Sequence, residues 1–162
     1  MKKLILTLIS AITLLNFAYA QTDNWVNYKI DEKLSVKLPT QPETINRGVM
    51  AHTPDSLVCL AYKLAEVDSA TLTRAVSSPG FPDGLKAAMS ASQPGLNLGE
   101  MKAGKWHGYT CYNVDGAKPA MGLKVGLLIL IVDGRIYTLG AMMPDRHDIN
   151  EKNIFFNTLK LN

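Results

Sequence analysis

The side chains best suited to nucleophilic or metal chemistry in this chain are two cysteines and three histidines: Cys59, Cys111, His52, His107 and His147. No two of the histidines lie one helical turn apart, and the two cysteines are too far apart in sequence to form a zinc-binding pair. The residue types that could hold a metal are therefore scattered. The sequence predicts no metal site and no cofactor.

Cys111 and His107 are the candidate thiol and base that lie near each other in sequence. If both lie on one strand they share a face but are about 13 Å apart, whereas a base must come within about 3 Å of the thiol whose proton it takes. His52 on another strand is a second candidate base. The sequence thus predicts a protein that is not an enzyme, with a thiol- or histidine-dependent enzyme as one alternative.

Other catalytic motifs are missing or have a structural explanation. The sequence contains no G-x-S-x-G motif and no Gly-Lys-Ser/Thr of a phosphate-binding loop. Two carboxylate pairs, Glu66 with Asp68 and Asp145 with Asp148, come directly before predicted helices. Acidic side chains at that position cap a helix and complement its dipole, so these pairs predict helix starts and no acid–base chemistry.

A cluster of basic and aromatic residues is a candidate binding element. Lys102, Lys105 and His107 surround Trp106 beside a predicted turn at 103–104. Such a cluster suits an anionic or carbohydrate partner through charge and stacking. The alternative is a solvated turn above a buried tryptophan.

Phe81 is a second candidate contact residue, because it lies in a glycine- and proline-rich break over 78–84. An aromatic side chain in such a loop either anchors a partner or packs beneath the loop. We take the break and the 102–107 segment as the predicted contact elements of the protein.

Residues 1–20 have the three parts of a secretory signal peptide. Lys2 and Lys3 are followed by an apolar segment over 4–15, and Ala18-Tyr19-Ala20 supplies a small-residue cleavage site. The segment is shorter than the roughly 20 residues of a membrane-spanning helix. The sequence therefore predicts cleavage after this leader and export to the periplasm or outside the cell.

The chain predicted to remain is one domain over 21–162, beginning at Gln21. Its longest apolar run, 127–132, is far too short to span a membrane. The full sequence has 17 basic and 14 acidic residues, and without the leader 15 basic residues face the same 14 acidic ones. This balance excludes a strongly basic nucleic-acid-binding module, and the 47% apolar content excludes a disordered chain.

Export also bears on the two cysteines, since an oxidising compartment permits a disulfide. Cys59 and Cys111 each lie in a predicted strand, so they can pair only if those strands are neighbours. A disulfide and two buried free thiols both remain open at this point.

The hydrophobic pattern predicts strands separated by two helical regions. Leu and Val alternate with polar residues over 34–38, and an Asp-Gly turn joins two long apolar segments, which is a strong hairpin signal. The predicted strands are 25–30, 34–38, 44–50, 57–67, 98–102, 106–114, 123–132 and 135–142, and the predicted helices are 68–77, 85–92 and 150–159. This order predicts an α+β fold with an antiparallel sheet flanked by helices.

Several of these segments together resemble the PsbP-like superfamily, which includes DcrB-type periplasmic and Mog-type Ran-binding proteins. They are Trp25, the strand Leu34-Ser35-Val36-Lys37-Leu38 with its following prolines, the long strand through Tyr62, Trp106-His107-Gly108-Tyr109, Gly134-Arg135-Ile136-Tyr137 and the closing segment from Phe156 to Leu161. The resemblance covers most of 24–161 and implies an antiparallel sheet between helices, an α/β/α sandwich. These are core and turn positions, so they imply no binding residues.

Three functions follow as hypotheses. The first is an exported, non-catalytic domain that binds a partner protein or a cell-envelope component through Phe81 and the 102–107 segment. The second is a small-ligand carrier with a pocket between sheet and helices, lined by Tyr62, Tyr109 and Tyr137. The third is the thiol- or histidine-dependent enzyme described above.

Overall fold

The computed structural model describes residues 22–46 and 48–162. The predicted signal peptide and Gln21 lie outside the described residues. Within the described part of the chain, no helix is both long and apolar enough to cross a membrane.

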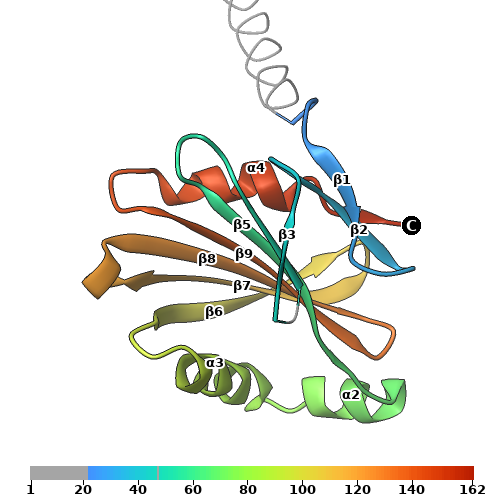
Figure 1. Cartoon of the computed structure of the whole chain (residues 1–162). Coiled ribbons are helices and arrows are strands. Elements are labelled where there is room, and N and C mark those ends of the chain that lie inside the picture. The colour runs from blue at the N-terminus through green and yellow to red at the C-terminus, as the bar shows by residue number, and fades with distance from the viewer. Residues whose placement is uncertain (1–21, 47) are drawn as a thin grey trace, which may run out of the picture.

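In the described part of the chain, ten strands, three α-helices and two short 3-10 turns form the fold (Figure 1). In chain order they are β1 (Val26–Lys29), β2 (Leu34–Leu38), β3 (Glu43–Ile45), β4 (Gly48–His52), β5 (Val58–Glu66), α2 (Ser69–Val76), α3 (Phe81–Ser92), β6 (Asn97–Trp106), β7 (Tyr109–Lys118), η1 (Pro119–Met121), β8 (Leu123–Val132), β9 (Arg135–Pro144), η2 (Ile149–Glu151), α4 (Lys152–Phe156) and β10 (Lys160–Leu161).

The core of the molecule is a seven-stranded antiparallel sheet in the order β3-β4-β5-β9-β8-β7-β6. The predicted hairpin of β8 and β9 is confirmed, and its turn residues Asp133 and Gly134 both have positive φ angles, 46° and 83°. These two strands are apolar on both faces, as strands in the middle of a covered sheet must be. The predicted α+β class with an antiparallel sheet is confirmed.

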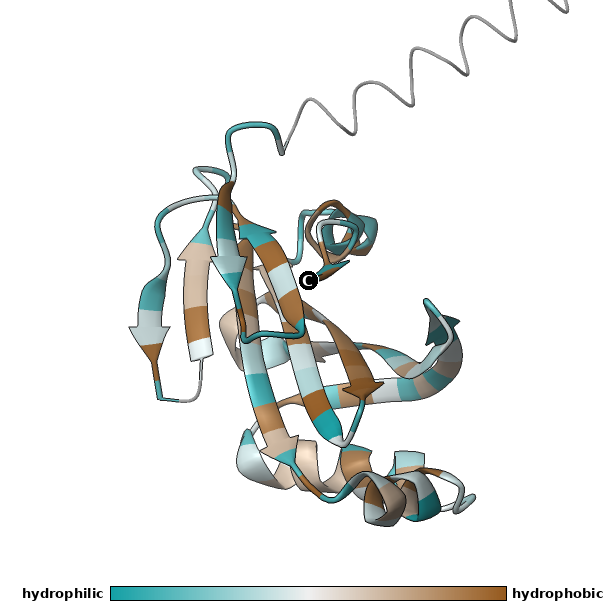
Figure 2. Ribbon diagram, turned by 90° about the vertical axis from the view of Figure 1, so that its right-hand side faces the viewer, coloured by the Kyte–Doolittle hydropathy of each residue, from teal (hydrophilic) through white to brown (hydrophobic). Residues whose placement is uncertain are grey.

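Two different layers cover the two faces of this sheet. Helices α2 and α3 pack on one face, which we call the helix face, through Leu72 and Met89. The opposite face is covered by α4 together with a second sheet of three strands, β1-β2-β10. We call it the closed face. Figure 1 shows α4 on one side of the sheet and α2 and α3 on the other, and Figure 2 shows hydrophobic bands recurring along the strands between them.

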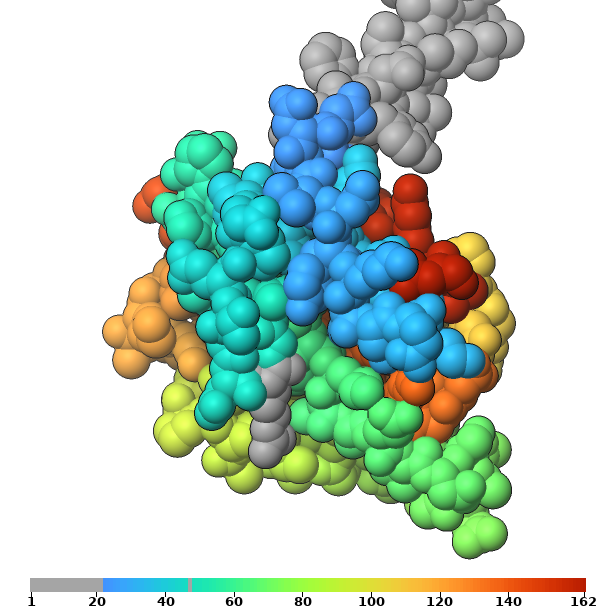
Figure 3. Space-filling model, turned by 45° about the vertical axis from the view of Figure 1, so that its right-hand side comes forward, coloured from blue at the N-terminus to red at the C-terminus, as the bar shows by residue number. Residues whose placement is uncertain are grey.

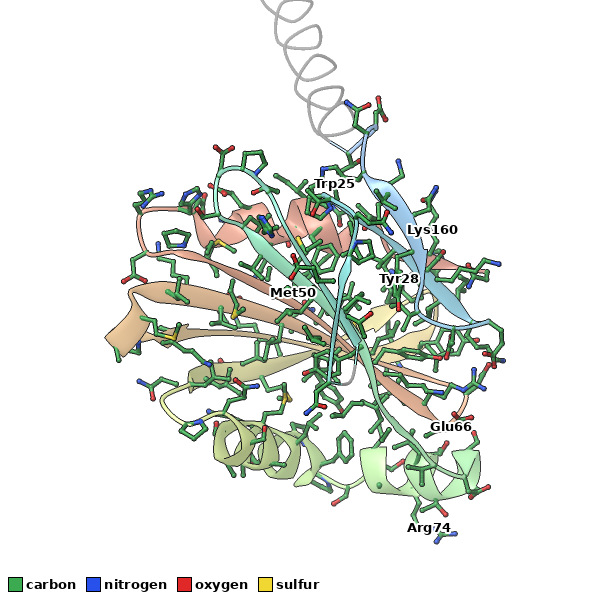
Figure 4. All side chains as sticks on the ribbon, viewed as in Figure 1. Trp25, Tyr28, Met50, Glu66, Arg74 and Lys160 are labelled. Carbon is green, nitrogen blue, oxygen red and sulfur yellow. The ribbon has the colours of Figure 1, made fainter. Side chains whose placement is uncertain are left out.

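The small sheet joins the two ends of the described chain. β10 pairs with β2, and the Asn162 amide donates to the Lys33 carbonyl at 2.9 Å. Figure 3 shows the C-terminal residues beside the N-terminal strands at the surface. Leu34, Val36 and Leu38 alternate inward from β2 as the sequence predicts. The layer over the closed face is therefore part sheet and part helix, and helices cover both faces of the seven-stranded sheet as predicted.

A group of ion pairs fastens this small sheet to the central hairpin. The Tyr137 hydroxyl donates to Asp31 Oδ2 at 2.7 Å, and Arg135 contacts Asp31, Glu32 and Glu66. Burial tends to raise the pKa of Asp31, but hydrogen bonds from Tyr137 and from the Lys33 and Leu34 amides, with the Arg135 charge, lower it below its usual value. Asp31 is thus held as a carboxylate between the two sheets.

Several predicted boundaries are wrong. The predicted strand over 44–50 is a hairpin, β3 and β4. The hairpin of β6 and β7 turns at His107 and Gly108, whose φ angles are 48° and 85°, and not at 103–104. The irregular break predicted over 78–84 is largely the first turn of α3, where Pro82 fits because the first turn leaves backbone amides unpaired.

The last helix is also shorter than predicted. It covers Lys152–Phe156, preceded by the turn η2. Asp148 caps the turn by accepting from the Asn150 amide at 3.0 Å, while the Glu151 carboxylate pairs with His147 and does not complete a capping box. The sequence pattern of this last segment predicts that Ile154, Phe155 and Leu159 face the sheet. Phe155 and Leu159 are buried in the core of the closed face, whereas Ile154 is only partly buried.

A disulfide between Cys59 and Cys111 does not form in this fold, and both residues are free thiols. Cys59 lies on β5 and Cys111 on β7, with β9 and β8 between them. Three strand spacings alone amount to about 14 Å, twice the Cα separation of about 7 Å that a disulfide tolerates. The neighbouring strands that pairing requires are therefore absent from this topology.

Candidate functional site

A cavity of about 520 Å³ lies between the C-terminal half of α3 and the helix face of the sheet. Its volume is within the range of small-molecule sites. The lining residues come from seven segments of the chain and are Ile45, Asn46, Leu60, Tyr62, Leu64, Met89, Ser92, Gln93, Leu96, Lys118, Val125, Leu127 and Met142.

The sheet shapes the floor of this cavity by placing a glycine between two leucines. Gly140 on β9 pairs with Leu60 on one side and Leu127 on the other. A Cβ atom at Gly140 would lie 3.3 Å from Leu127 Cδ2 and 3.4 Å from Leu60 Cβ. The two leucine side chains therefore close over the glycine, and they, not Gly140, line the cavity.

Burial separates the floor of the cavity from its mouth. Leu96, Val125 and Leu127 are buried in the apolar core of the helix face, whereas Ser92 and Gln93 are exposed at the end of α3. The Lys118 ammonium, at the end of β7, donates to Gln93 Oε1 at 3.0 Å. The cavity is thus apolar within and polar where it meets solvent.

The walls of the cavity include two methionines. Met89 and Met142 contribute flexible, polarisable side chains that can adapt to a ligand's shape. Elsewhere on the helix face, Thr138 is fully buried and its hydroxyl has no hydrogen-bond partner among the described residues. An unpaired buried hydroxyl costs about 1–3 kcal/mol, but Thr138 does not line the cavity.

The structure does not gather the predicted contact residues into one surface. Phe81 begins α3 and packs on Tyr112, with ring centroids 6.0 Å apart, on the helix face. Trp106 packs against the core of the opposite, closed face. Phe81 therefore packs beneath its segment, and the predicted flexible loop around it is wrong.

The basic residues of the predicted cluster point to different sides of β6, which is an edge strand. Lys105 donates to Thr110 Oγ1 at 3.0 Å beside the helix face, whereas Lys102 lies on the side of Gly104 and Trp106. His107 lies in the turn with its ring 4.5 Å from that of Trp106. The residues of the cluster therefore lie along the edge strand β6 and its turn, and they do not form one surface patch.

The three tyrosines predicted to line a pocket are also divided between the faces. Tyr62 lines the cavity described above. Tyr137 belongs to the core of the closed face and Tyr109 packs against that core. A pocket between sheet and helix is present, but Tyr62 alone of the three contributes to it.

A second, open cavity of about 530 Å³ lies between the β4–β5 turn and η2. It includes Ser56, with a φ angle of 71°, and His147, whose Nδ1 is 2.9 Å from Glu151 Oε2. A serine, a histidine and a carboxylate line one space. No hydrogen bond joins Ser56 to His147 in the part of the chain that the structure describes, so the arrangement lacks the contact that activates a serine nucleophile.

Neither cysteine is suited to nucleophilic chemistry. Burial raises the pKa of Cys59 to about 12, and it also raises the pKa of Cys111. The thiolate is the reactive form, so both side chains behave as small apolar groups in the core of the closed face. In residues 22–46 and 48–162, no group of three His, Cys, Asp or Glu side chains is placed to hold a metal ion.

No family model matches the sequence, and no curated protein matches it. Among solved structures, the chain is similar to the solution structure of cyanobacterial PsbP (CyanoP) from Synechocystis sp. PCC 6803, with a TM-score of 0.52 and 11% sequence identity. The similarity covers 85% of this chain and 92% of that chain. At this identity it shows the fold alone, and the chain has a PsbP-like fold.

Proposed function

We propose that this protein is an exported, non-catalytic binding domain that holds a small ligand in the cavity beneath α3. The observation that carries the proposal is the cavity itself, which is apolar at its floor, with Val125 and Leu127 buried there, and polar at its mouth. Sites of this kind bind small molecules by apolar contact and fix their orientation with a few polar groups. Export is proposed from the leader sequence.

The non-catalytic part of the proposal rests on the residues around the cavity. Among the described residues, its lining contains no histidine, cysteine or carboxylate. Lysine, tyrosine and serine act in catalysis when a neighbouring base or charge activates them, and the lining itself offers no histidine or carboxylate to activate Lys118, Tyr62 or Ser92. We therefore assign the cavity to retaining a ligand and not to transforming it.

The test is a native mass spectrum of the mature protein isolated from its own host, compared with two tryptophan variants. Leu60→Trp places a bulky ring inside the cavity. Val58→Trp is the matched control, because it lies one pleat away on the same face of β5 but is not part of the lining. We expect a non-covalent added mass in the wild type and in Val58→Trp that is lost in Leu60→Trp.

Two outcomes would contradict the proposal: a wild-type protein that carries no added mass and takes up no apolar probe, or an added mass that Leu60→Trp retains. Circular dichroism and thermal unfolding of both variants show whether the fold has been kept. The denaturing spectrum of the same sample also gives the mature mass, which tests cleavage before Gln21.

A second candidate function is contact with a partner protein or envelope component along β6. The observation that favours it is the open edge of this ten-residue strand, which carries Lys102, Lys105 and Trp106. Open edges can pair with a strand of another chain. The double variant Lys102→Glu, Lys105→Glu should weaken that contact and leave ligand retention unchanged, whereas Leu60→Trp should do the reverse.

A further inference from the structure

We infer that the ligand of the α3 cavity is a single-chain amphiphile with an anionic head group, its chain on the floor formed by Leu60, Leu127, Val125 and Met142 and its head beside Lys118. This inference rests on the proposed function, because it names the class of molecule that the same cavity would take. It is argued from the charge at the mouth, the free donors there and the shape of the floor.

The charge at the mouth is positive. Lys118 carries the one formal charge among the lining residues that the structure gives. The remaining polar groups of the lining, from Asn46, Tyr62, Ser92 and Gln93, are neutral. A cationic head group would meet an uncompensated ammonium here, while an anionic one would form a charge-assisted hydrogen bond.

Lys118 also has donors available for such a head group. Its one hydrogen bond in the described structure goes to a neutral acceptor, Gln93 Oε1, at 3.0 Å. An ammonium has three donor hydrogens, and Lys118 forms no salt bridge with a carboxylate of the described chain. Gln93 can keep its bond or give it up, so the head group does not have to displace an internal ion pair.

The floor selects an apolar chain. Leu60 and Leu127 face each other across Gly140, and Val125 and Met142 are paired one pleat further along the same strands. This places apolar side chains of three neighbouring strands, β5, β9 and β8, side by side in the lining. An alkyl chain would bury its methylenes against them, whereas a sugar or a peptide would leave its polar groups unpaired on the same surface.

The test uses three probes with the same alkyl chain: dodecanoate, dodecanol and dodecyltrimethylammonium. Calorimetric titration of the wild-type protein should show that dodecanoate binds about tenfold more tightly than dodecanol, and that the cation binds most weakly. Lys118→Met should lower the affinity for dodecanoate about tenfold and leave the affinity for dodecanol unchanged. Lys118→Arg should retain most of the preference, and added salt should reduce it in the wild type.

The matched control is Lys86→Met, which removes a lysine from α3 that does not line the cavity. This variant should bind all three probes like the wild type. Equal binding of dodecanoate and dodecanol to the wild type, or an unchanged preference in Lys118→Met, would overturn the anionic head group and leave the cavity as a ligand site. Binding that Leu60→Trp does not weaken would overturn the proposed function itself.

Discussion

The two faces of the seven-stranded sheet are built from similar apolar strands but are covered differently. On the closed face, α4 and the small sheet bury Phe155, Leu34 and Tyr137 completely. On the helix face, Met89 of α3 and the leucines below it border a cavity of about 520 Å³. Two helices resting on a twisted sheet leave space where the side chains between them are small or absent, and a second sheet with interdigitating side chains does not.

The difference teaches where stability and binding are located in this protein. A closely packed face contributes most of the free energy of folding, because each buried atom has partners on all sides. A face with a cavity gives up part of that free energy and gains the capacity to hold a molecule. The ion pairs at Arg135 and the proposed site at Lys118 accordingly lie on opposite layers of the domain.

The largest effect should come from truncating one aromatic residue on the closed face. Phe155→Ala removes a fully buried ring, so the free energy of unfolding should fall by about 3–5 kcal/mol. Met89→Ala, which enlarges a cavity that already exists, should cost less than about 2 kcal/mol. Urea unfolding of both variants measures the two losses, and equal losses would remove the energetic contrast between the faces.

A smaller effect should come from the hydrogen bond that joins the two sheets. Tyr137→Phe removes the hydroxyl that donates to Asp31, and the free energy of unfolding should fall by about 1.5–3 kcal/mol near neutral pH. Tyr112→Phe is the control, since this buried tyrosine on the helix face has no hydroxyl hydrogen bond to another described residue. It should change stability by less than about 0.5 kcal/mol.

The loss of stability in Tyr137→Phe should also depend on pH. Because the folded pKa of Asp31 is lowered, its contribution is fully present above the unfolded pKa of about 3.9 and is lost as pH falls through the folded value. The gap between wild type and Tyr137→Phe should therefore close with increasing acidity below about pH 4. A gap that stays constant down to the folded pKa would mean that the hydroxyl acts through packing alone.

The smallest effects should separate two glycines, one on each face. A Cβ atom at Gly126 would collide with the Lys152 side chain, which crosses the closed face to pair with Asp115, so Gly126→Ala should cost about 1–2 kcal/mol. Gly140→Ala would bring its Cβ to 3.3 Å from Leu127 Cδ2 and 3.4 Å from Leu60 Cβ, a tight contact without a collision, and should cost less than Gly126→Ala, about 0.5–1 kcal/mol. Thermal unfolding of the two variants measures both losses of stability. A larger loss for Gly140→Ala than for Gly126→Ala would show that side chains pack more tightly on the helix face.

Most of the architecture could be predicted from the sequence, because it depends on local patterns. Alternation in β2, the Asp133-Gly134 turn and the Asp68 cap each determine their own segment. The predictions failed where two patterns competed. His107-Gly108 is a less common turn pair than the usual Asn-Gly or Asp-Gly, and Phe81-Pro82 looks like a loop until the first turn of a helix is allowed to contain proline.

The cavity could not be predicted in the same way, because no motif marks it. Its floor depends on the register that sets Leu60 and Leu127 on either side of Gly140, and its mouth depends on Lys118 meeting the end of α3. The pocket predicted from Tyr62, Tyr109 and Tyr137 was wrong for a related reason, because side chains of one sheet point to both of its faces. An apolar strand interrupted by a lone glycine beneath a predicted helix is the signal that was available.

The pairing of β10 with β2 sets the order in which the molecule can be completed. Thr158 and Lys37 exchange hydrogen bonds between the Thr158 hydroxyl and the Lys37 backbone across 121 positions of the chain. Such distant contacts are costly in chain entropy and form late. During synthesis, β1 and β2 are therefore left without their third strand until almost the whole described domain has been made. A nascent chain in that condition stays open to chaperones, and to a translocation channel if the leader directs it to one, until its C-terminal strand arrives.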